Sequence, residues 1–334
     1  MQPALTSPWR LGRVAVPNRV MLAPLAGIGN WFVRLQAKRF GAGMAVSEMV
    51  STHAIHHHNR RTCEEMLYID PRESAGGPVA IQLFGEDPGL MREGAAAVIE
   101  AGADIVDINM GCPVPKVRRT GAGVGLLEQP DRAVALAAGA VEGAGGAPVT
   151  VKLRSGLRAG DESGYRLALR LVDEAGVAGI AFHPRTANVH HKGTPDYALA
   201  ARLVDELDAP VIITGGLADA ERVREAYART GAAAVMLARG ALGNPWLFEE
   251  LLAGRAAEPD AGEVQAELAW TVERAREAFG PGRADRYLRK FYPWYVDRLG
   301  LAGADRRELQ RRMQSAPSAD EALAALREAS LATA

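Results

Sequence analysis

The feature that most constrains how this 334-residue chain can fold is a regular alternation of short apolar runs with segments of helical periodicity. Each run has the length of a buried strand, and Gly or Pro separates it from the helical pattern that follows. The eight runs are VMLAPL (20–25), MAVSEM (44–49), VAIQLF (79–84), DIVDIN (104–109), PVTVKL (148–153), AGIAFH (178–183), PVIITG (210–215) and AAVMLA (233–238). Helical periodicity covers residues 31–40, 88–101, 131–141, 164–175 and 219–229.

Eight buried strands that alternate with helices over about 250 residues predict an α/β fold, the (β/α)8 TIM barrel. A doubly wound parallel sheet is the alternative, because it shows the same alternation. After Gly254 the pattern changes: RAAEPDAGE (255–263) is a polar joint, and no strand pattern follows it. We therefore predict a barrel domain over residues 1–254 and a small all-helical domain over residues 255–334. Helices are expected at 263–278, 283–296, 306–313 and 320–327.

Composition limits the class of protein. The formal net charge of −1 gives no general attraction to nucleic acid or to an anionic membrane, so an anionic partner needs a local basic patch. Two cysteines, Cys63 and Cys112, cannot form a disulfide framework and suit a reducing compartment. The first residues lack an apolar signal-peptide core, and no apolar run is long enough to span a bilayer. A cytoplasmic protein without membrane contact is expected.

Polar and reactive side chains follow six of the eight predicted strands. In a TIM barrel the active site forms where the carboxyl ends of the strands meet. Polar groups at the ends of apolar strands need hydrogen-bond partners, and packing alone does not explain so many of them. The strand ends hold Ala23, Pro24 and Leu25, then Glu48, Gln82, Asn109 with Cys112, Lys152 with Arg154, and His183 with Arg185.

The last two predicted strands indicate a phosphate site. Gly215 and Gly216 follow the seventh strand, and Arg239 and Gly240 follow the eighth. Glycines let backbone N–H groups approach an anion, and the loops after strands seven and eight are the usual phosphate cradle of this barrel. Tight turns without a ligand are the alternative interpretation. No G-x-G-x-x-G opens a helix after a strand, which argues against a Rossmann dinucleotide site.

A flat ring that lies across the barrel mouth would use the remaining strand-end residues. Gln82 could pair with a pyrimidine-like ring edge, and Lys152 could face a ring that becomes anionic on reduction. The backbone of residues 23–25 would form an apolar floor. These are the requirements of flavin mononucleotide, FMN. An aldolase with Lys152 as its Schiff-base lysine is a rival, but it would need neither Cys112 nor the appended helices.

The chain resembles the tRNA-dihydrouridine synthases, most of all their bacterial B-type branch. The resemblance rests on APLAGI (23–28), VSEMVS (46–51), IQLFG (81–85), DINMGCP (107–113), KVRRTGAGVGLLEQPD (116–131), VKLRSG (151–156), HPRT (183–186), ARGALGNPW (238–246) and RKFYPWY (289–295). Three stretches depart from the common family pattern: Ile28-Gly29-Asn30 stands for ITD, Thr214-Gly215-Gly216 for NGD, and His183-Pro184-Arg185 for HGR.

The resemblance implies FMN-dependent reduction of the C5=C6 bond of a D-loop uridine, with position 17 as a candidate. NADPH would reduce the flavin, with NADH as the alternative donor. It implies that Cys112 is the general acid, because a thiol with a pKa of about 8.5 is mostly protonated at neutral pH and can protonate C5. A small buried hydrophobe is the alternative for Cys112. The resemblance also implies that Asn109 and Arg185 hold uracil, and that Lys152 and His183 contact the flavin.

Two basic segments are candidates for holding tRNA. The glycine-rich loop after Cys112 has three cations, and residues 281–312 have nine Lys or Arg against four acids, with aromatic residues between them. The candidate contacts are Lys116, Arg118 and Arg119 in the loop, and Arg286, Arg289 and Lys290 on one expected helix face. Aromatic residues of a helical core are the alternative interpretation of the second segment. The loop is expected to act as a lid, and the target uridine must swing out of the tRNA.

Other histidines and other functions remain as alternatives. His56, His57 and His58 lack ligand spacing, so no metal site is expected, and His190 and His191 are expected in solvent or behind the site. A flavin enzyme for a small pyrimidine, like dihydroorotate dehydrogenase, would keep the barrel chemistry without RNA. A non-enzymatic RNA-binding protein would lack flavin. A monomer is expected.

Overall fold

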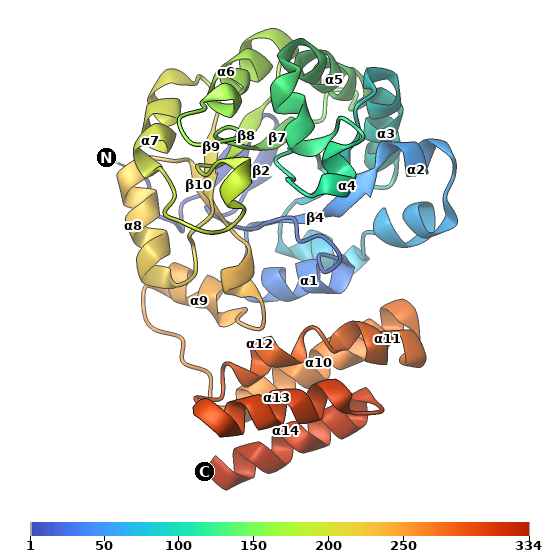
Figure 1. The fold of residues 1–334 in the computed structure, drawn as a ribbon, viewed down its shortest axis with the longest axis vertical. Helices are drawn as coiled ribbons and strands as arrows, with labels where there is room; N and C mark the ends of the chain where they lie inside the picture. The colour runs from blue at the N-terminus through green and yellow to red at the C-terminus, as the bar shows by residue number, and fades with distance from the viewer. Residues whose placement is uncertain (1, 334) are drawn as a thin grey trace. The chain divides into compact units, whose positions relative to one another are not determined.

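The computed structural model describes residues 2–333, which fall into two compact units, one up to Arg239 and one from Gly240 onward (Figure 1). The first unit is a barrel and the second is helical. Helix α9 (Trp246–Ala253) falls in the second unit, although the sequence assigns it to the barrel domain. The domain limits at residues 254 and 255 stay a prediction.

The first unit is a closed barrel of eight parallel strands. The order β10-β3-β4-β5-β6-β7-β8-β9 follows the chain and closes between the last strand and the first. All eight predicted strands and the predicted fold class are confirmed. The strands are β3 (Val20–Leu22), β4 (Met44–Ser51), β5 (Val79–Phe84), β6 (Ile105–Met110), β7 (Val149–Arg154), β8 (Gly179–His183), β9 (Val211–Thr214) and β10 (Ala234–Leu237).

Helices follow the strands, and side-chain caps set where several of them begin. Asn30, Asp87 and Asp219 accept N–H bonds at the starts of three predicted helices, which satisfies backbone donors that a helix leaves unpaired. The sequence missed α7 (Tyr197–Glu206), although Asp196 caps it in the same way. The helices of this unit are α1 (Trp31–Arg39), α2 (Thr52–His56), α3 (Pro88–Glu100), α4 (Pro115–Arg118), α5 (Pro130–Gly143), α6 (Ser163–Ala175), α7 and α8 (Ala220–Thr230).

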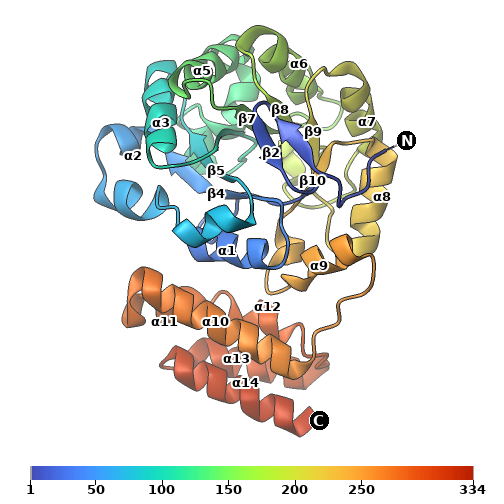
Figure 2. The same ribbon diagram turned by 180° about the vertical axis from the view of Figure 1, so that it is seen from behind.

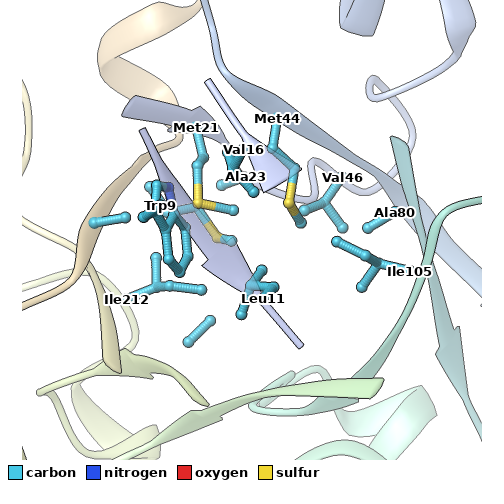
Figure 3. Packing of buried hydrophobic residues seen from close by; sticks show 13 residues of the cluster. Trp9, Leu11, Val16, Met21, Ala23, Met44, Val46, Ala80, Ile105 and Ile212 are labelled. Carbon is cyan, nitrogen blue, oxygen red and sulfur yellow. The ribbon is translucent and has the colours of Figure 1, made fainter. Parts of the chain in front are cut away.

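A short hairpin that the sequence did not predict closes the amino-terminal end of the barrel. Strands β1 (Trp9–Leu11) and β2 (Val14–Val16) pair antiparallel around Gly12, which has a positive φ of 51° (Figure 2). Trp9, Leu11 and Val16 are buried among residues at the starts of the barrel strands (Figure 3). Each such buried side chain stabilises the fold by about 1.5–3 kcal/mol. The opposite, carboxyl end of the barrel therefore remains for a site.

The second unit consists of helices α9, α10 (Ala261–Phe279), α11 (Pro281–Leu288), α12 (Tyr292–Val296), α13 (Gly303–Ser315) and α14 (Ala319–Thr333). The prediction of a single helix over 283–296 is wrong, because α11 ends at Leu288 and a new helix, α12, begins at Tyr292. Pro293 has no N–H to donate to the Arg289 carbonyl, which accepts a bond from Gln314 Nε2 at 3.4 Å instead. Arg286 therefore lies within α11, whereas Arg289 caps the carboxyl end of that helix and Lys290 follows it.

Among residues 2–333, no helix combines the length and the apolar character that crossing a membrane requires.

Candidate active site

Cys112 lies in a turn at the carboxyl end of β6, and four hydrogen bonds fix that turn. The Asn109 side-chain oxygen accepts the backbone N–H of Cys112 at 2.9 Å and that of Gly111 at 3.2 Å. Arg154 Nε donates to the Gly111 carbonyl at 3.0 Å. The Cys112 carbonyl accepts the N–H of Val124 at 3.1 Å. The residue is half-buried, so a reagent or substrate from the mouth can meet its thiol.

A row of polar side chains runs beneath this turn, across neighbouring strands. Thr150 Oγ1 donates to Asp107 Oδ1 and Gln82 Nε2 donates to Asp107 Oδ2, both at 2.6 Å. Asn109 Nδ2 donates to Gln82 Oε1 at 2.9 Å. Burial raises the pKa of Asp107 to about 6, although the bonds from Thr150 and Gln82 and the charge of Lys152 oppose the rise. Gln82 and Asn109 thus bond each other, a contact that their expected ligand roles did not include.

A bulge in β4 supplies part of this row. The register of β4 against β5 shifts between Val46 and Met49, and buried Ser47 lies in the shift. Ser47 Oγ accepts the backbone N–H of Gln82 at 3.0 Å, a donor that the interrupted ladder would leave unpaired. Met49 Sδ receives a weak contact from Asn109 Nδ2 at 3.7 Å.

Four cations gather at the carboxyl ends of the strands: Lys152, Arg154, Arg185 and Arg239. Burial, and then the charge of Arg154, lower the pKa of Lys152 to about 8. Burial, and then Arg185, lower the pKa of Arg154 to about 10. Within the described part of the chain, none of the four has an ion pair, and Asp107 is the one carboxylate that stabilises the charge of Lys152. Unbalanced positive charge at a barrel mouth favours an anionic ligand.

His183 is neutral and is held between Arg185 and a glycine turn. Burial, followed by the charges of Lys152, Arg154 and Arg185, holds the pKa of His183 far below its usual range. Arg185 Nη1 lies 3.3 Å from His183 Nε2. Because a guanidinium can only donate, Nε2 accepts this hydrogen bond and Nδ1 carries the imidazole proton. The Arg185 guanidinium also donates to the Gly193 carbonyl at 2.8 Å and 3.1 Å. The expected uracil-binding arginine therefore also holds the loop after β8.

The two neighbouring histidines differ in their contacts. His191 is largely exposed, but its ring stacks on His183 with 6.4 Å between centroids. This partial burial of the ring, together with the charge of Arg239, lowers the pKa of His191 to about 4. His190 is exposed with a positive φ of 52°, and its carbonyl accepts a bond from Arg154 Nη1 at 2.7 Å.

Gly215 and Gly216 follow β9 with positive φ values of 94° and 82°. A Cβ on Gly215 would lie 2.3 Å from the ring of His183, and one on Gly216 would lie 2.7 Å from Pro195 and from Tyr197. Both positions therefore require glycine for packing as well as for backbone conformation. This contact explains why the chain carries Gly216 where the family pattern has an acid. Arg239 and Gly240 lie in η5 (Arg239–Ala241), directly after β10.

The turn after β3, which contains Ala23, Pro24 and Leu25, is tied to its neighbours. Glu48 accepts the N–H of Gly27 at 2.8 Å, and its own N–H donates to the Gly29 carbonyl at 3.1 Å. Arg34 also donates to the Gly29 carbonyl, at 3.3 Å. Asn30 caps α1, a position that asparagine and aspartate fill equally well. This cap accounts for the departure at Asn30 from the family's aspartate.

The basic loop after Cys112 is a packed helical segment. Pro115 is the first residue of α4, a position that proline favours, so the chain turns into a short helix here instead of continuing extended from Pro113. Val117 is buried, as are the apolar residues of η3 (Gly123–Glu128). Arg118 pairs with Glu128 at 2.8 Å. Lys116 and Arg119 are exposed and have no ion pair within the described residues. Motion of this segment as a lid stays a prediction.

The second unit presents part of the expected basic and aromatic surface. Arg286 and Arg289 are exposed, and Lys290 Nζ lies 3.8 Å from the centroid of the Tyr287 ring. Tyr292 and Tyr295 are core residues, as the alternative interpretation held.

The sequence missed the supporting residues of this site. The sequence places Arg154 at a strand end without indicating a role, and in the structure its side chain joins the Cys112 turn to the carbonyls of Thr186 and His190. Asp107, Thr150 and Ser47 also went unassigned. A buried acid within a strand was the available signal for Asp107. Across residues 2–333, no three His, Cys, Asp or Glu side chains gather so as to hold a metal ion.

Comparison with known proteins adds sequence relatives of this barrel. A family model described as dihydrouridine synthase matches residues 21–334. The chain is 34% identical over 292 residues to tRNA-dihydrouridine synthase B of Xanthomonas campestris pv. campestris, covering 86% of each chain. It is 33% identical over 307 residues to tRNA-dihydrouridine synthase B of Pseudomonas aeruginosa, covering 90% of this chain and 91% of that one.

Solved structures share the barrel fold. Morphinone reductase aligns with a TM-score of 0.58 at 20% identity, over 79% of this chain and 93% of that one. A complex of 2-naphthoyl-CoA reductase aligns with a TM-score of 0.61 at 14% identity, over 76% of this chain and 53% of that one.

Proposed function

The chain belongs to the dihydrouridine synthase family, and from this premise we propose how it reduces uridine in tRNA: with FMN at the barrel mouth, NADPH as electron donor and Cys112 as the proton donor. The proposal extends to a D-loop uridine, with position 17 as the candidate, and to a monomeric, cytoplasmic enzyme. NADH is the alternative donor.

The single observation that carries the proposal is the cation cluster at the mouth. Burial first, and then the positive charge of a neighbouring arginine, lower the pKa values of Lys152, Arg154 and Arg185, so the protein assembles positive charge at the mouth against its own repulsion. An anionic ligand with a phosphate relieves that repulsion. Gly215 and Arg239 follow adjacent strands β9 and β10, where this barrel usually holds a phosphate. The residues present therefore fit FMN.

The rest of the site fits a flat ring. Gln82 Nε2 uses one hydrogen on Asp107 and keeps the other for a ring acceptor. Lys152 is the cross-strand partner of Asn109 and lies within electrostatic reach of Asp107, and its charge would face an anionic ring. Residues Ala23, Pro24 and Leu25 would form the floor. When bound and reduced, the flavin supplies a hydride to C6 of uracil.

Cys112 completes the reduction by giving the thiol proton to C5 of uracil. The fixed turn keeps the thiol at the mouth, and the half-buried position limits water around it. Lys152 and Arg154 lie within electrostatic reach of Cys112, so they stabilise the thiolate that remains after proton transfer. Arg185 and Asn109 would hold the uracil, and Lys116, Arg118 and Arg119 would meet its RNA backbone, with Arg286, Arg289 and Lys290 of the second unit as further tRNA contacts.

The decisive experiment combines a spectrum with a tRNA assay. The purified protein should show the visible absorbance of bound FMN, lose it with NADPH, and form dihydrouridine in tRNA that lacks the modification. Cys112→Ala should keep flavin reduction but lower dihydrouridine formation by at least about 100-fold, the contribution expected of a general acid. Cys63→Ala, which changes the other, exposed cysteine, is the matched control.

Three results would contradict this function. A protein that cannot be loaded with FMN would favour the non-enzymatic alternative. Reduction of free orotate or uracil with no reaction on tRNA would favour a small-pyrimidine enzyme. Unchanged dihydrouridine formation in Cys112→Ala would remove the proposed proton donor.

A further inference from the structure

We propose that Asp107 is a positioning residue that fixes which way the side-chain amides of Gln82 and Asn109 point, and thereby holds the turn that carries Cys112. The consequence for catalysis rests on the proposed function, whereas the consequence for the turn does not.

The proposal starts from an unbroken chain of hydrogen bonds. Gln82 Nε2 donates to Asp107 at 2.6 Å, and Asn109 Nδ2 donates to Gln82 Oε1 at 2.9 Å. Asn109 Oδ1 then accepts the N–H of Cys112 at 2.9 Å and that of Gly111 at 3.2 Å. The chain runs from a buried carboxylate to the backbone of the reactive cysteine.

The barrel register places the members of the chain next to one another. Gln82 is the cross-strand partner of Asp107, and Asp107 is the cross-strand partner of Thr150. Asn109 follows Asp107 by two positions and therefore points to the same face of β6. Asp107 and Gln82 are each 1% exposed, so water does not replace their partners. Alternative bonds would have to come from within the row or from a bound flavin.

The chain has a direction because its end can only accept. A primary amide has one acceptor end and one donor end, so it fits between two partners in either of two orientations. An ionised carboxylate offers no donor, and it forces Gln82 to present Nε2 to Asp107 and Oε1 to Asn109. Asn109 must then present Nδ2 to Gln82, which leaves Oδ1 for the two backbone N–H groups.

The cost of the arrangement supports its role. A buried carboxylate is expensive, and burial raises the pKa of Asp107 to about 6. Two short donors and the charge of Lys152 keep the ionised form, which is the form that the chain needs. A packing role alone would be filled by an apolar residue of similar size at lower cost.

The test reverses the chain and then restores it. Asp107→Asn adds a donor at the end of the chain, so that Gln82 and Asn109 can turn round and the N–H groups of Gly111 and Cys112 lose their acceptor. In the double variant Asp107→Asn/Gln82→Glu, the carboxylate moves one place along the row. It accepts from the new amide at position 107 and from Asn109, which returns Asn109 Oδ1 to the turn and keeps the net charge of the parent.

The measurement is the rate at which iodoacetamide alkylates Cys112 in the purified protein, with and without added FMN, in a Cys63→Ser background. We expect Asp107→Asn to raise this rate about tenfold, because the lost turn bonds are together worth about one to two kcal/mol and the thiol becomes more accessible. The double variant should return the rate to within about twofold of the parent. Asp104→Asn, the same change at the start of β6, should leave it unchanged.

Gln82→Met provides a second route if Asp107→Asn does not fold. It removes the middle of the chain with little change in volume and should also raise the alkylation rate. An unchanged rate in Asp107→Asn or in Gln82→Met would overturn the proposal, as would a double variant that folds but stays as reactive as the single one. The alkylation assay needs neither tRNA nor turnover, so a protein that makes no dihydrouridine but shows this pattern would refute the proposed function and leave Asp107 in its role.

Discussion

Several residues at the barrel mouth have two roles: they are expected to bind the ligand, and they also hold neighbouring loops in place. Asn109 was expected to hold uracil, yet its oxygen already binds two backbone N–H groups and its nitrogen contacts Gln82 and Met49. Arg185 was expected to hold uracil as well, and it also bonds the carbonyl of Gly193. At this scale, the side chains that face the ligand are also the ones that hold the loops in place.

The pH dependence of FMN binding should depend on Lys152. Because the pKa of Lys152 is lowered to about 8, the ammonium is charged below that pH and is lost as the pH rises through it. FMN affinity should therefore fall about tenfold between about pH 7 and about pH 9.5, with the midpoint raised in the complex by the ligand's negative charge. Fluorescence quenching of FMN measures this. In Lys152→Arg the side chain stays charged over this range, so the pH dependence of FMN affinity should disappear. A fall in affinity that persists in this variant would show that another group causes the dependence.

Gly215 should be more sensitive to a side chain than its backbone conformation alone explains. Ala at Gly215 meets both a positive φ of 94° and the His183 ring at 2.3 Å, whereas Ala at Gly102 meets a φ of 95° and open space. Urea unfolding should show a loss of about 1 kcal/mol for Gly102→Ala and at least about 2 kcal/mol more for Gly215→Ala. Equal losses would mean that His183 moves aside freely.

Whole elements support the mouth from outside the barrel. The 3-10 helix η2 (Pro71–Gly76) packs on α1 through a buried ion pair, in which Arg34 Nε lies 2.7 Å from Glu73 Oε2. Arg34 also donates to the Gly29 carbonyl in the turn after β3. Lys38 Nζ donates to the Glu73 carbonyl at 2.8 Å, and burial lowers its pKa to about 8. An element without strand-end residues thus helps to shape the proposed floor of the flavin site.

Breaking this ion pair should be costly. Glu73→Gln leaves the Arg34 charge buried without its counter-ion, which should lower the free energy of unfolding by about 3–5 kcal/mol. The matched control is Glu174→Gln, which breaks an exposed pair with Arg170 and should change the unfolding midpoint little. Urea denaturation of both variants gives the comparison. Similar midpoints for both would show that the buried pair contributes little to stability.

At the scale of the whole molecule, the charge of the chain is nearly balanced but unevenly distributed. The formal net charge is −1, while the barrel mouth holds four cations that form no ion pair among the described residues. In the second unit, Arg306, Arg311 and Arg312 are paired with acids, so the nine cations counted in residues 281–312 overstate the charge available to RNA. Arg286 and Arg289 are exposed and carry no such pair within residues 2–333.

Binding of tRNA should respond to these exposed cations and not to others. Arg286→Glu should weaken tRNA affinity about tenfold at low salt and less at high salt, because fewer counterions are released. The FMN spectrum and its reduction by NADPH should stay the same. Arg13→Glu makes the same charge change in the β1–β2 hairpin turn, at the amino-terminal end of the barrel strands. Filter binding over a salt series compares the two; equal effects would refute a tRNA contact at Arg286.

The sequence by itself determined the eight strands, the helices after most of them and the set of strand-end residues. Strands and amphipathic helices are local patterns, and the barrel rule then assigns their carboxyl ends to one face. It also located the cysteine and the glycines of the mouth. It missed the β1–β2 hairpin, because three-residue strands give little periodicity. It also missed the break at residues 289–291, for which Pro293 was the available local signal.

Only the tertiary structure decided how the site residues are paired. The bond from Gln82 to Asp107 and the approach of Gly215 to His183 join segments that are far apart in the chain, and no local pattern encodes such contacts. Asp107 and Arg154 have local surroundings of an ordinary strand, yet one sets the direction of the amide chain and the other ties the Cys112 turn to the loop after β8. Residue types are written in the sequence, whereas the partners that give each polar group its orientation and charge arise only when the barrel closes.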